Sequence, residues 1–575
     1  MTKSHGCDAL TRRTFVTGIS AGMALLGLPG FPPPARARVP PPATLIGDRF
    51  DLTLGYRPVN FSGLPGTALA INGATPGPIL RWKEGRTITL DIHNPLPTGS
   101  AIHWHGIKLP STMNGIPGIS FAGILPGQRF RYRFNVQQSG TYWYQSAWGF
   151  QQQQGLYGAI VIDPAEADPI TSDRDYVVLL SDWSDERPTT IYANLKKDGH
   201  YYGRRHQRTA TDLWREVRAK GIEQTLRERH RWNLLSQSDR TVSDVSGYTF
   251  LLNGQTPEDN WTALFKPGET VRLRFINASA MTLFDLRIPD LAMTVVAADG
   301  QNIQPLRVDE FRLGTGETYD VVVRPSGDRP YTVFAQAIDR SGYASGTLTP
   351  QAGLTAEVPP MDPIPVLGKR DLGLTNANST PDSDEESMAR LAPAGLGSNS
   401  PIAHPSSEKS FAVATRAQAP ASGLNDPGVG LRLHRRRHNR RVLTYADLRS
   451  LTPTTDQRQP QRELQLHLTG NQDRYMWSID GIKFKDAYPL VFNHGERLRI
   501  TLVNDTLLIQ PMHLHGFWSE LETGDGTYLP RKHTVLVQPS AKISYLVSAD
   551  TYGRWALQSQ MLYRTQGMCR EVRIV

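Results

Sequence analysis

The chain has 575 residues, a net charge of +9 and only two cysteines. Its length exceeds what one hydrophobic core supports and indicates about three or four domains. With 39% hydrophobic residues, 50 Gly and 42 Pro, the composition favours a loop-rich β protein over a helical bundle. Nucleic acid is not the expected partner, because much of the positive excess lies in the N-terminal leader and in one short run.

Residues 1–37 have the features of an export signal. The arginine pair at 12–13 precedes an apolar stretch at 19–28, and a small-x-small cleavage site follows at 35–37. The apolar stretch is too short to span a bilayer as a mature helix. The arginine pair resembles a twin-arginine signal, so we predict a periplasmic mature protein exported by that route. An ordinary secretory signal is the alternative.

Cleavage of the leader would remove Cys7 and leave Cys569 as the only cysteine. We therefore expect no intramolecular disulfide. No other segment is apolar for long enough to cross a bilayer, so no integral membrane segment is expected after cleavage.

Three stretches, at 45–165, 170–350 and 442–575, show short strands separated by turns. Runs typical of strands lie at 87–93, 129–134, 156–162, 271–276, 319–323, 498–503 and 542–547. Similar segments, each a turn followed by a strand, begin at Lys83, Lys266 and Asn493. Three similar β units in one chain favour a repeated sandwich domain.

Two segments break this pattern. Leu213, Val217, Ile222 and Leu226 are spaced for a helix, which predicts a surface helical insertion near 205–235. Residues 351–441 are rich in Pro, Ser, Asn and Gly, which predicts a long disordered linker. The linker ends in a basic run at 431–441. Such a run is typical of a solvated face or tail, and an anionic partner is the alternative.

Two histidine pairs carry the chemistry of the chain. His103 and His105 flank Trp104 in a strand-like stretch, and alternate residues of a strand project from one face. His513 and His515 repeat the arrangement in the last β unit. Imidazole pairs suit copper, zinc and iron. One pair alone is ambiguous, but two pairs, each followed by Gly, favour a shared site.

The sequence around these pairs resembles the four signature blocks of multicopper oxidases. The blocks lie at 101–106, 140–144, 510–516 and 553–556. The chain is most similar to the periplasmic copper-resistance protein A group, at 252–256, 296–300, 444–449, 475–481, 521–526 and 530–534. The resemblance covers nearly the whole mature chain. It implies an all-β fold of three cupredoxin-like Greek-key β-sandwich domains, with a copper cluster between the first and third.

The chain departs from the family pattern at most ligand positions. Six expected histidines are replaced, by Gln145, Ala147, Gln510, Gln558, Gln560 and Arg564, and the expected cysteine is replaced by Ser559. The resemblance assigns positions 510, 559 and 564 to the mononuclear copper through which electrons enter. Amide, hydroxyl and guanidinium groups do not replace imidazole and thiolate ligands, so we predict that this site is lost.

The paired coppers that reduce oxygen would retain only His105 and His515, and one imidazole each cannot hold two ions. The remaining copper of the cluster is matched by His103 and His513. We therefore predict at most one metal ion, bound by His103 and His513 with His105 and His515 nearby, and copper or zinc suits such a pocket. The alternative is an empty pocket in which the four histidines are polar packing and glutamines supply the lost hydrogen bonds.

Three functions follow from these predictions. The first is copper binding in copper homeostasis without oxygen reduction, so that laccase-type activity is absent and no catalytic residue is assigned. The second is a metal-free cupredoxin scaffold with a binding role in the cell envelope. The third is an enzyme with new chemistry at a mononuclear metal site. A metal ion is the only partner that the sequence indicates.

Overall fold

The computed structural model describes residues 42–205, 242–365, 367, 371, 421–524 and 526–575. The predicted leader, the predicted helical insertion beyond residue 205 and residues 372–420 of the predicted linker lie outside this part of the chain. Among the described residues, no helix is both long and apolar enough to cross a membrane.

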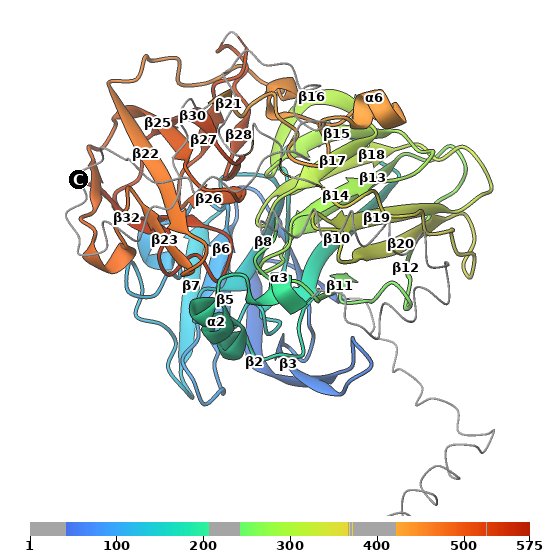
Figure 1. Ribbon diagram of the computed structural model, residues 1–575, viewed down its shortest axis with the longest axis horizontal. Helices are drawn as coiled ribbons and strands as arrows, with labels where there is room; N and C mark the ends of the chain where they lie inside the picture. The colour runs from blue at the N-terminus through green and yellow to red at the C-terminus, as the bar shows by residue number, and fades with distance from the viewer. Residues whose placement is uncertain (1–41, 206–241, 366, 368–370, 372–420, 525) are drawn as a thin grey trace, which may run out of the picture. The chain divides into compact units, whose positions relative to one another are not determined.

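The predicted all-β class is confirmed, because the described strands form six sheets in three successive pairs (Figure 1). Each pair is called a unit here: the first runs from β1 to β9, the second from β10 to β20 and the third from β21 to β32. Within every unit, strands distant in the chain are neighbours in a sheet, such as β4 and β9 in the first. This crossing order is typical of Greek-key sandwiches.

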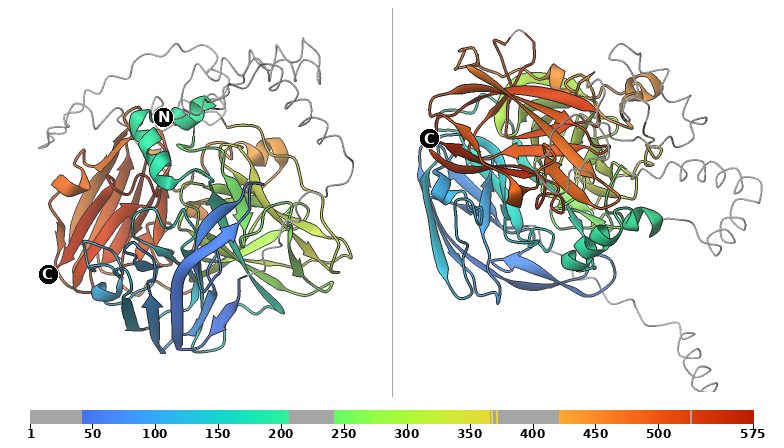
Figure 2. Two further views of the ribbon diagram at one scale, coloured as in Figure 1. Left: turned by 90° about the horizontal axis from the view of Figure 1, so that it is seen from below. Right: turned by 60° about the vertical axis from the view of Figure 1, so that its left-hand side comes forward.

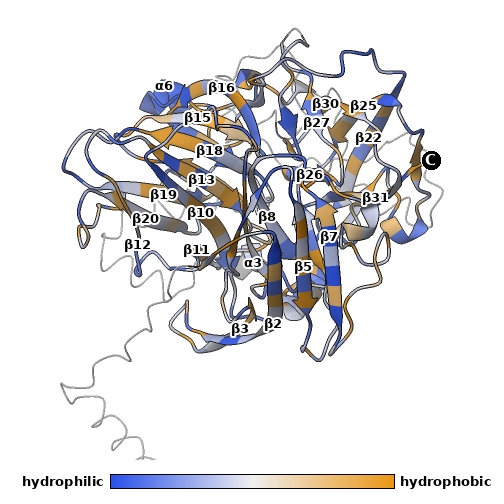
Figure 3. Cartoon of the chain, turned by 180° about the vertical axis from the view of Figure 1, so that it is seen from behind, coloured by the Kyte–Doolittle hydropathy of each residue, from blue (hydrophilic) through white to orange (hydrophobic). Residues whose placement is uncertain are grey.

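The first unit contains a five-stranded sheet, β1-β4-β9-β8-β6, and a four-stranded sheet, β3-β2-β5-β7. Its strands are β1 (Thr44–Ile46), β2 (Arg49–Val59), β3 (Gly66–Ile71), β4 (Ile79–Lys83), β5 (Thr87–His93), β6 (Ile102–His105), β7 (Arg129–Asn135), β8 (Gly140–Ser146) and β9 (Tyr157–Asp163). Apolar and polar residues alternate along β7, as Figure 3 shows. Tyr132 and Phe134 of β7 are buried and pack against Trp104. This alternation buries one face of the sheet and leaves the other to solvent.

The second unit contains a six-stranded sheet, β11-β10-β13-β18-β15-β16, and a five-stranded sheet, β12-β20-β19-β14-β17. Its strands are β10 (Arg174–Trp183), β11 (Thr249–Leu252), β12 (Trp261–Leu264), β13 (Val271–Asn277), β14 (Phe284–Arg287), β15 (Met293–Ala298), β16 (Gln301–Val308), β17 (Glu310–Leu313), β18 (Thr318–Val323), β19 (Tyr331–Ala337) and β20 (Tyr343–Thr349). Two helices that the sequence did not predict, α2 (Pro188–Lys197) and α3 (Tyr201–Arg205), follow β10.

The third unit contains a sheet ordered β23-β22-β25-β30-β27-β28, with β21 paired to β30, and a sheet ordered β24-β32-β31-β26-β29. Its strands are β21 (Ala421–Ser422), β22 (Arg462–Asn471), β23 (Met476–Ile479), β24 (Leu490–Phe492), β25 (Arg497–Asn504), β26 (Gln510–Leu514), β27 (Ser519–Leu521), β28 (Arg531–Lys532), β29 (Thr534–Val537), β30 (Ala541–Ser548), β31 (Gly553–Ser559) and β32 (Cys569–Ile574). The helical turns are η1 (Ser111–Met113) in the first unit and α6 (His434–His438), η4 (Tyr445–Asp447) and η5 (Phe484–Asp486) in the third. Buried apolar residues of the second and third units form one continuous core, and the first unit has a core of its own. Figure 2 shows the three β-rich regions from two further sides.

The last part of the predicted linker is folded, so the prediction is wrong for residues 421–441. Strand β21 pairs with β30, and both Val429 and Leu431 are buried. A composition rich in turn-forming residues did not reveal these few apolar anchors.

The basic run at 431–441 is also not wholly a solvated face. Arg432 binds both Asp371 and Asp426, with hydrogen bonds of 2.6–2.9 Å. Arg440 binds Asp362 through two hydrogen bonds of 3.0 Å. These carboxylates lie outside the run in the sequence. They neutralise the charges of Arg432 and Arg440, for which the run itself contains no acidic partner.

Candidate metal centre

The two histidine pairs meet where strand β6 of the first unit faces strand β26 of the third. His103 and His105 lie in β6, His513 lies in β26, and His515 follows directly after that strand. All four are buried, with exposed fractions of 1% or less. The structure therefore brings together all four of the predicted site residues from strands more than 400 positions apart.

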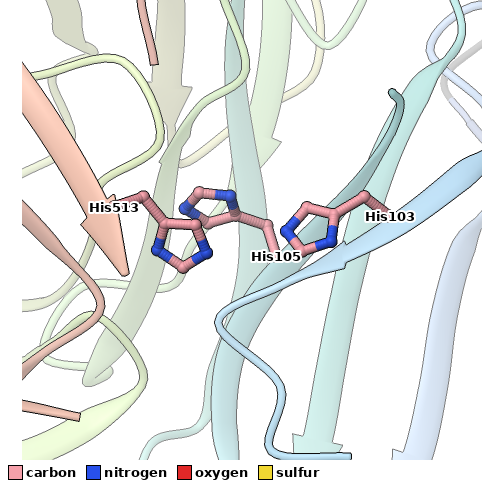
Figure 4. A group of neighbouring side chains, drawn as sticks. All are labelled: His103, His105 and His513. Atoms are coloured by element: carbon pink, nitrogen blue, oxygen red, sulfur yellow. The ribbon is translucent and has the colours of Figure 1, made fainter. Parts of the chain in front are cut away.

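Each of the four imidazole rings contacts at least two others of the group. His105 stacks on His513 with ring centroids 4.0 Å apart, and His515 lies 4.3 Å from both His103 and His513. His103 and His513, the two predicted main ligands, are 5.7 Å apart. Possible ligand atoms of His103, His105 and His513 all lie within 4.8 Å of one another, and Figure 4 shows these three rings side by side.

Three of the four rings are held in place by a hydrogen bond at one of their two nitrogens. His103 Nδ1 bonds to the carbonyl of Asn114 at 2.9 Å, and His105 Nε2 bonds to Thr534 Oγ1 at 2.9 Å. His513 Nδ1 bonds to the carbonyl of His533. These contacts fix the ring orientations in the way that outer partners orient metal-binding histidines.

The other nitrogen of each ring is buried without a partner. Among the residues that the structure describes, this holds for Nε2 of His103, His513 and His515 and for Nδ1 of His105. A buried polar atom without a hydrogen bond is costly unless something else satisfies it. Imidazole nitrogens are donors that suit a copper or zinc ion, and ligand atoms of His103, His105 and His513 lie close enough together to share one.

Burial keeps these rings in the neutral form that binds metals. Removal from water lowers the pKa of His103 to about 4. Burial, followed by repulsion from the neighbouring imidazoles, lowers the pKa of His105, His513 and His515 well below the ordinary value. All four rings are therefore uncharged at neutral pH.

A fifth buried histidine, His533, borders the cluster and was missed from the sequence. Its ring lies 4.7 Å from that of His105, and its Nδ1 bonds to Thr534 Oγ1 at 3.1 Å. The ring packs against Gly106, whose φ of 81° favours glycine and where a side chain would collide with His533. His533 lies in the stretch at 530–534 that carries the family resemblance, but a single histidine has no spacing signal.

An ion-pair network fixes the backbone that carries His533. Lys532 Nζ lies 3.0 Å from Asp299 Oδ2 and 3.0 Å from Glu317 Oε1, and all three side chains are fully buried. Burial alone would lower the pKa of Lys532, but the two carboxylates raise it, so the lysine remains charged. Asp299 also accepts hydrogen bonds from the backbone N–H groups of His533 and Thr534. The network thereby connects the second and third units.

The replaced positions near the cluster do not supply further imidazoles. Gln145 Nε2 donates to Gln560 Oε1 at 3.4 Å, which links β8 of the first unit to the third unit. Gln558 pairs with His513 across β31 and β26, and Ala147 packs among apolar residues. Among these replaced positions, glutamine therefore supplies a hydrogen bond between Gln145 and Gln560.

The three positions that the resemblance assigns to the mononuclear copper hold a different arrangement. Arg564 is buried and donates from Nε to Asp244 Oδ2 at 2.7 Å. It also donates to Gln510 Oε1 at 3.0 Å, and its guanidinium lies 4.6 Å from the ring centre of Trp477. Ser559 Oγ accepts a backbone hydrogen bond. A buried guanidinium and an amide are not copper ligands, so these residues do not fit a copper ion.

Cys569 pairs with Gln558 across β32 and β31 and does not belong to a group of possible metal ligands among the described residues. It is buried among Ile116, Ile119 and Ala556, and burial raises the pKa of its thiol to about 12. A protonated thiol in apolar surroundings is a poor metal ligand. Only the imidazole cluster therefore fits a metal ion at the positions that the family resemblance assigns.

Three family models, each described as multicopper oxidase, match residues 53–167, 174–355 and 457–575. The chain is 48% identical to the copper resistance protein A homolog of Pseudomonas syringae pv. tomato, over 98% of this chain and 99% of that protein. It is 46% identical to copper resistance protein A of Escherichia coli, with 98% and 99% coverage.

Solved structures with the same arrangement include Fet3p, a multicopper oxidase that functions in iron import (TM-score 0.65, 15% identity, 92% of this chain and 90% of that one). A laccase from Botrytis aclada matches with a TM-score of 0.62 and 18% identity, covering 93% of this chain and 88% of that one. At this identity the likeness concerns the fold, and the predicted cupredoxin-like fold is confirmed.

Proposed function

Because the chain belongs to the multicopper oxidase family, we propose that it is a periplasmic copper-binding protein of copper homeostasis that holds at most one copper ion at the family's cluster and does not reduce oxygen. The observation that carries this proposal is the set of buried imidazole nitrogens without partners. His103, His105 and His513 would bind the ion, with His515 as the adjacent fourth imidazole. A copper ion bound there would be held by neutral nitrogen donors, which suit both of its common oxidation states.

The loss of oxygen reduction is supported by the residues at the other copper positions. Arg564, at a position that the resemblance assigns to the mononuclear copper, forms an ion pair with Asp244, and a guanidinium repels any cation. The paired coppers would have one histidine each beside Gln145, Gln558 and Gln560. Two ions at the separation that oxygen reduction needs cannot be held by so few donors.

The test is a count of copper ions retained by the full chain after gel filtration, in wild type, His513→Ala and His494→Ala. His494 is an exposed histidine stacked on Tyr552 and serves as the matched control. We expect His513→Ala to retain one ion fewer than wild type and His494→Ala to retain the same number. Bound copper also stabilises the native state, by about 2.7 kcal/mol at a hundredfold excess over Kd, so the same ion should raise the melting temperature.

An equal count in wild type and His513→Ala would overturn the proposed site, and a count of zero in both would favour the metal-free scaffold. Oxygen uptake coupled to oxidation of a phenol or of Cu(I) would overturn the proposed loss of activity. An intense Cu(II)–thiolate absorption band would do the same, because it requires a cysteine ligand that the residues around Arg564 do not supply.

A further inference from the structure

A second group of possible metal ligands lies in the third unit's short helix α6 and in the chain segment after β20. Asp362, His434 and His438 each offer one ligand atom, and these atoms all lie within 4.8 Å of one another. None of the three belongs to the family blocks around the imidazole cluster.

Helix α6 brings the two histidines together. His434 and His438 are four positions apart, so they lie on the same face of one helical turn, with ring centroids 5.1 Å apart. Asn439 ends the helix in the left-handed conformation, with φ 52°. Two imidazoles at this spacing on a helix are a common half of a metal site.

A buried carboxylate orients the inner histidine. His434 Nδ1 bonds to Glu310 Oε2 at 2.7 Å, and both side chains are almost wholly enclosed. Contact with a carboxylate at one ring nitrogen fixes the tautomer and leaves the lone pair of Nε2 for a metal, as is usual for metal-binding histidines. Glu310 would thus orient a metal-binding histidine without contacting the metal itself.

Two arginines neutralise the two carboxylates of the group. Arg440 binds Asp362 at 3.0 Å and Glu310 at 3.3 Å, and Arg287 binds Asp362 at 3.3 Å. An approaching cation would compete with Arg440 for the oxygens of Asp362. The imidazoles must therefore supply most of the affinity, which favours ions that prefer nitrogen over calcium or magnesium.

The group is accessible from solvent on one side. Asp362 and His434 are buried, whereas His438 is exposed. An ion can therefore reach this group without any opening of the fold. In this respect the group differs from the imidazole cluster, whose rings are all enclosed.

We propose that Asp362, His434 and His438 form a second metal site, which binds one divalent copper or zinc ion. Two imidazoles and one carboxylate are a donor set that suits both ions. The proposal does not depend on the proposed function, because none of its residues lies in the imidazole cluster.

The test is titration of the metal-free full chain with Cu(II), followed by electron paramagnetic resonance. We expect His438→Ala to lose one bound ion per chain, with affinity at that site lower by about tenfold or more. His438 is exposed, so this substitution should leave the fold unchanged. His494→Ala, the exposed control, should keep the full complement. Glu310→Gln should lower the affinity for the same ion by about 10–100-fold. The melting curve of this variant shows whether it is still folded.

Equal stoichiometry and affinity in wild type and His438→Ala would overturn the second site. His513→Ala separates this outcome from the imidazole cluster, because that substitution should remove a different ion. The double variant His438→Ala/His513→Ala should retain neither. If His513→Ala binds one ion fewer than wild type and His438→Ala binds the same number, the result would support the proposed function and overturn the second site.

Discussion

Arg564 and Asp244 form a buried ion pair between positions that are 320 residues apart, with 2.7 Å between Nε and Oδ2. Their side chains are 1% and 0% exposed. Tyr475 also donates its hydroxyl hydrogen to Asp244 Oδ2 at 3.0 Å. The pair ties the segment before β11 to the loop between β31 and β32, so it connects the second and third units where the resemblance places a copper ion.

We expect removal of one partner of this pair to be strongly destabilising. Asp244→Asn should lower the free energy of unfolding by about 3–5 kcal/mol, because it leaves the buried guanidinium uncompensated. Arg564→Met should have a comparable effect, and the double variant should lose less than the sum of the two. Urea denaturation measures all three. Arg131→Ala, which breaks an ion pair whose arginine is 60% exposed, is the control and should change stability far less. Additive effects of the two substitutions would contradict this prediction.

A second prediction concerns pH and the buried carboxylate of Asp285. Burial alone would raise its pKa, but Arg312 and Arg340 lower it below the ordinary value of 3.8. The charged pair therefore stabilises the fold fully above about pH 4, and this stabilisation is lost as pH falls through the lowered pKa.

Asp285→Asn should accordingly lower stability at pH 7 by on the order of 3 kcal/mol. The difference from wild type should shrink as pH falls below 4, because the Asp285 carboxylate of the unfolded wild-type chain then binds a proton that the folded protein, with its lowered pKa, does not. Urea unfolding at pH 7, 5, 4 and 3 measures this. Asp328→Asn, at an exposed position, is the control. A difference that stays constant across this range would show that the charge of Asp285 is not the cause.

The thiol of Cys569 should be inert in the folded protein. Its pKa is raised to about 12 by burial, so the reactive thiolate is scarce at pH 8, and the side chain is 4% exposed. With Cys7→Ser leaving a single thiol, we expect no reaction with a thiol reagent until guanidinium unfolds the chain. Rapid labelling of the native protein would contradict the described environment.

Export should depend on the arginine pair in the leader. Replacing both Arg12 and Arg13 by lysine should remove the protein from the periplasmic fraction, because paired arginines distinguish a twin-arginine signal from an ordinary one. Immunoblotting of cell fractions measures this. Periplasmic protein at the wild-type level in the lysine variant would point to an ordinary secretory signal.

Local sequence patterns were sufficient for several of the strands and for the histidine pairs. The runs predicted at 87–93 and 271–276 correspond to β5 and β13. His103 and His105 share one face because the strand repeats every two residues, and this depends only on neighbouring positions. The family resemblance then implied a copper cluster between the first and third domains, which spacing alone could not do.

Contacts between distant positions could not be predicted in this way. No local signal marks Asp244 as the partner of Arg564, because the two are separated by most of the second and third units. His533 is a single histidine without a periodic partner, although it contacts His105. The basic run was predicted to be solvated because Asp362 and Asp371, which neutralise Arg440 and Arg432, lie outside it.

The enclosure of the imidazole cluster also has a consequence for how fast the ion proposed there would exchange with solution. Every ring of the cluster is at most 1% exposed, and the rings are supplied by two different units. An ion at the proposed site would therefore enter or leave through local opening of the surrounding residues, so its exchange would be limited by the frequency of that opening rather than by diffusion. An ion at the proposed site of Asp362, His434 and His438 would meet no such barrier, because His438 is exposed. The same chain would then combine one slowly exchanging position with one that equilibrates rapidly with its surroundings.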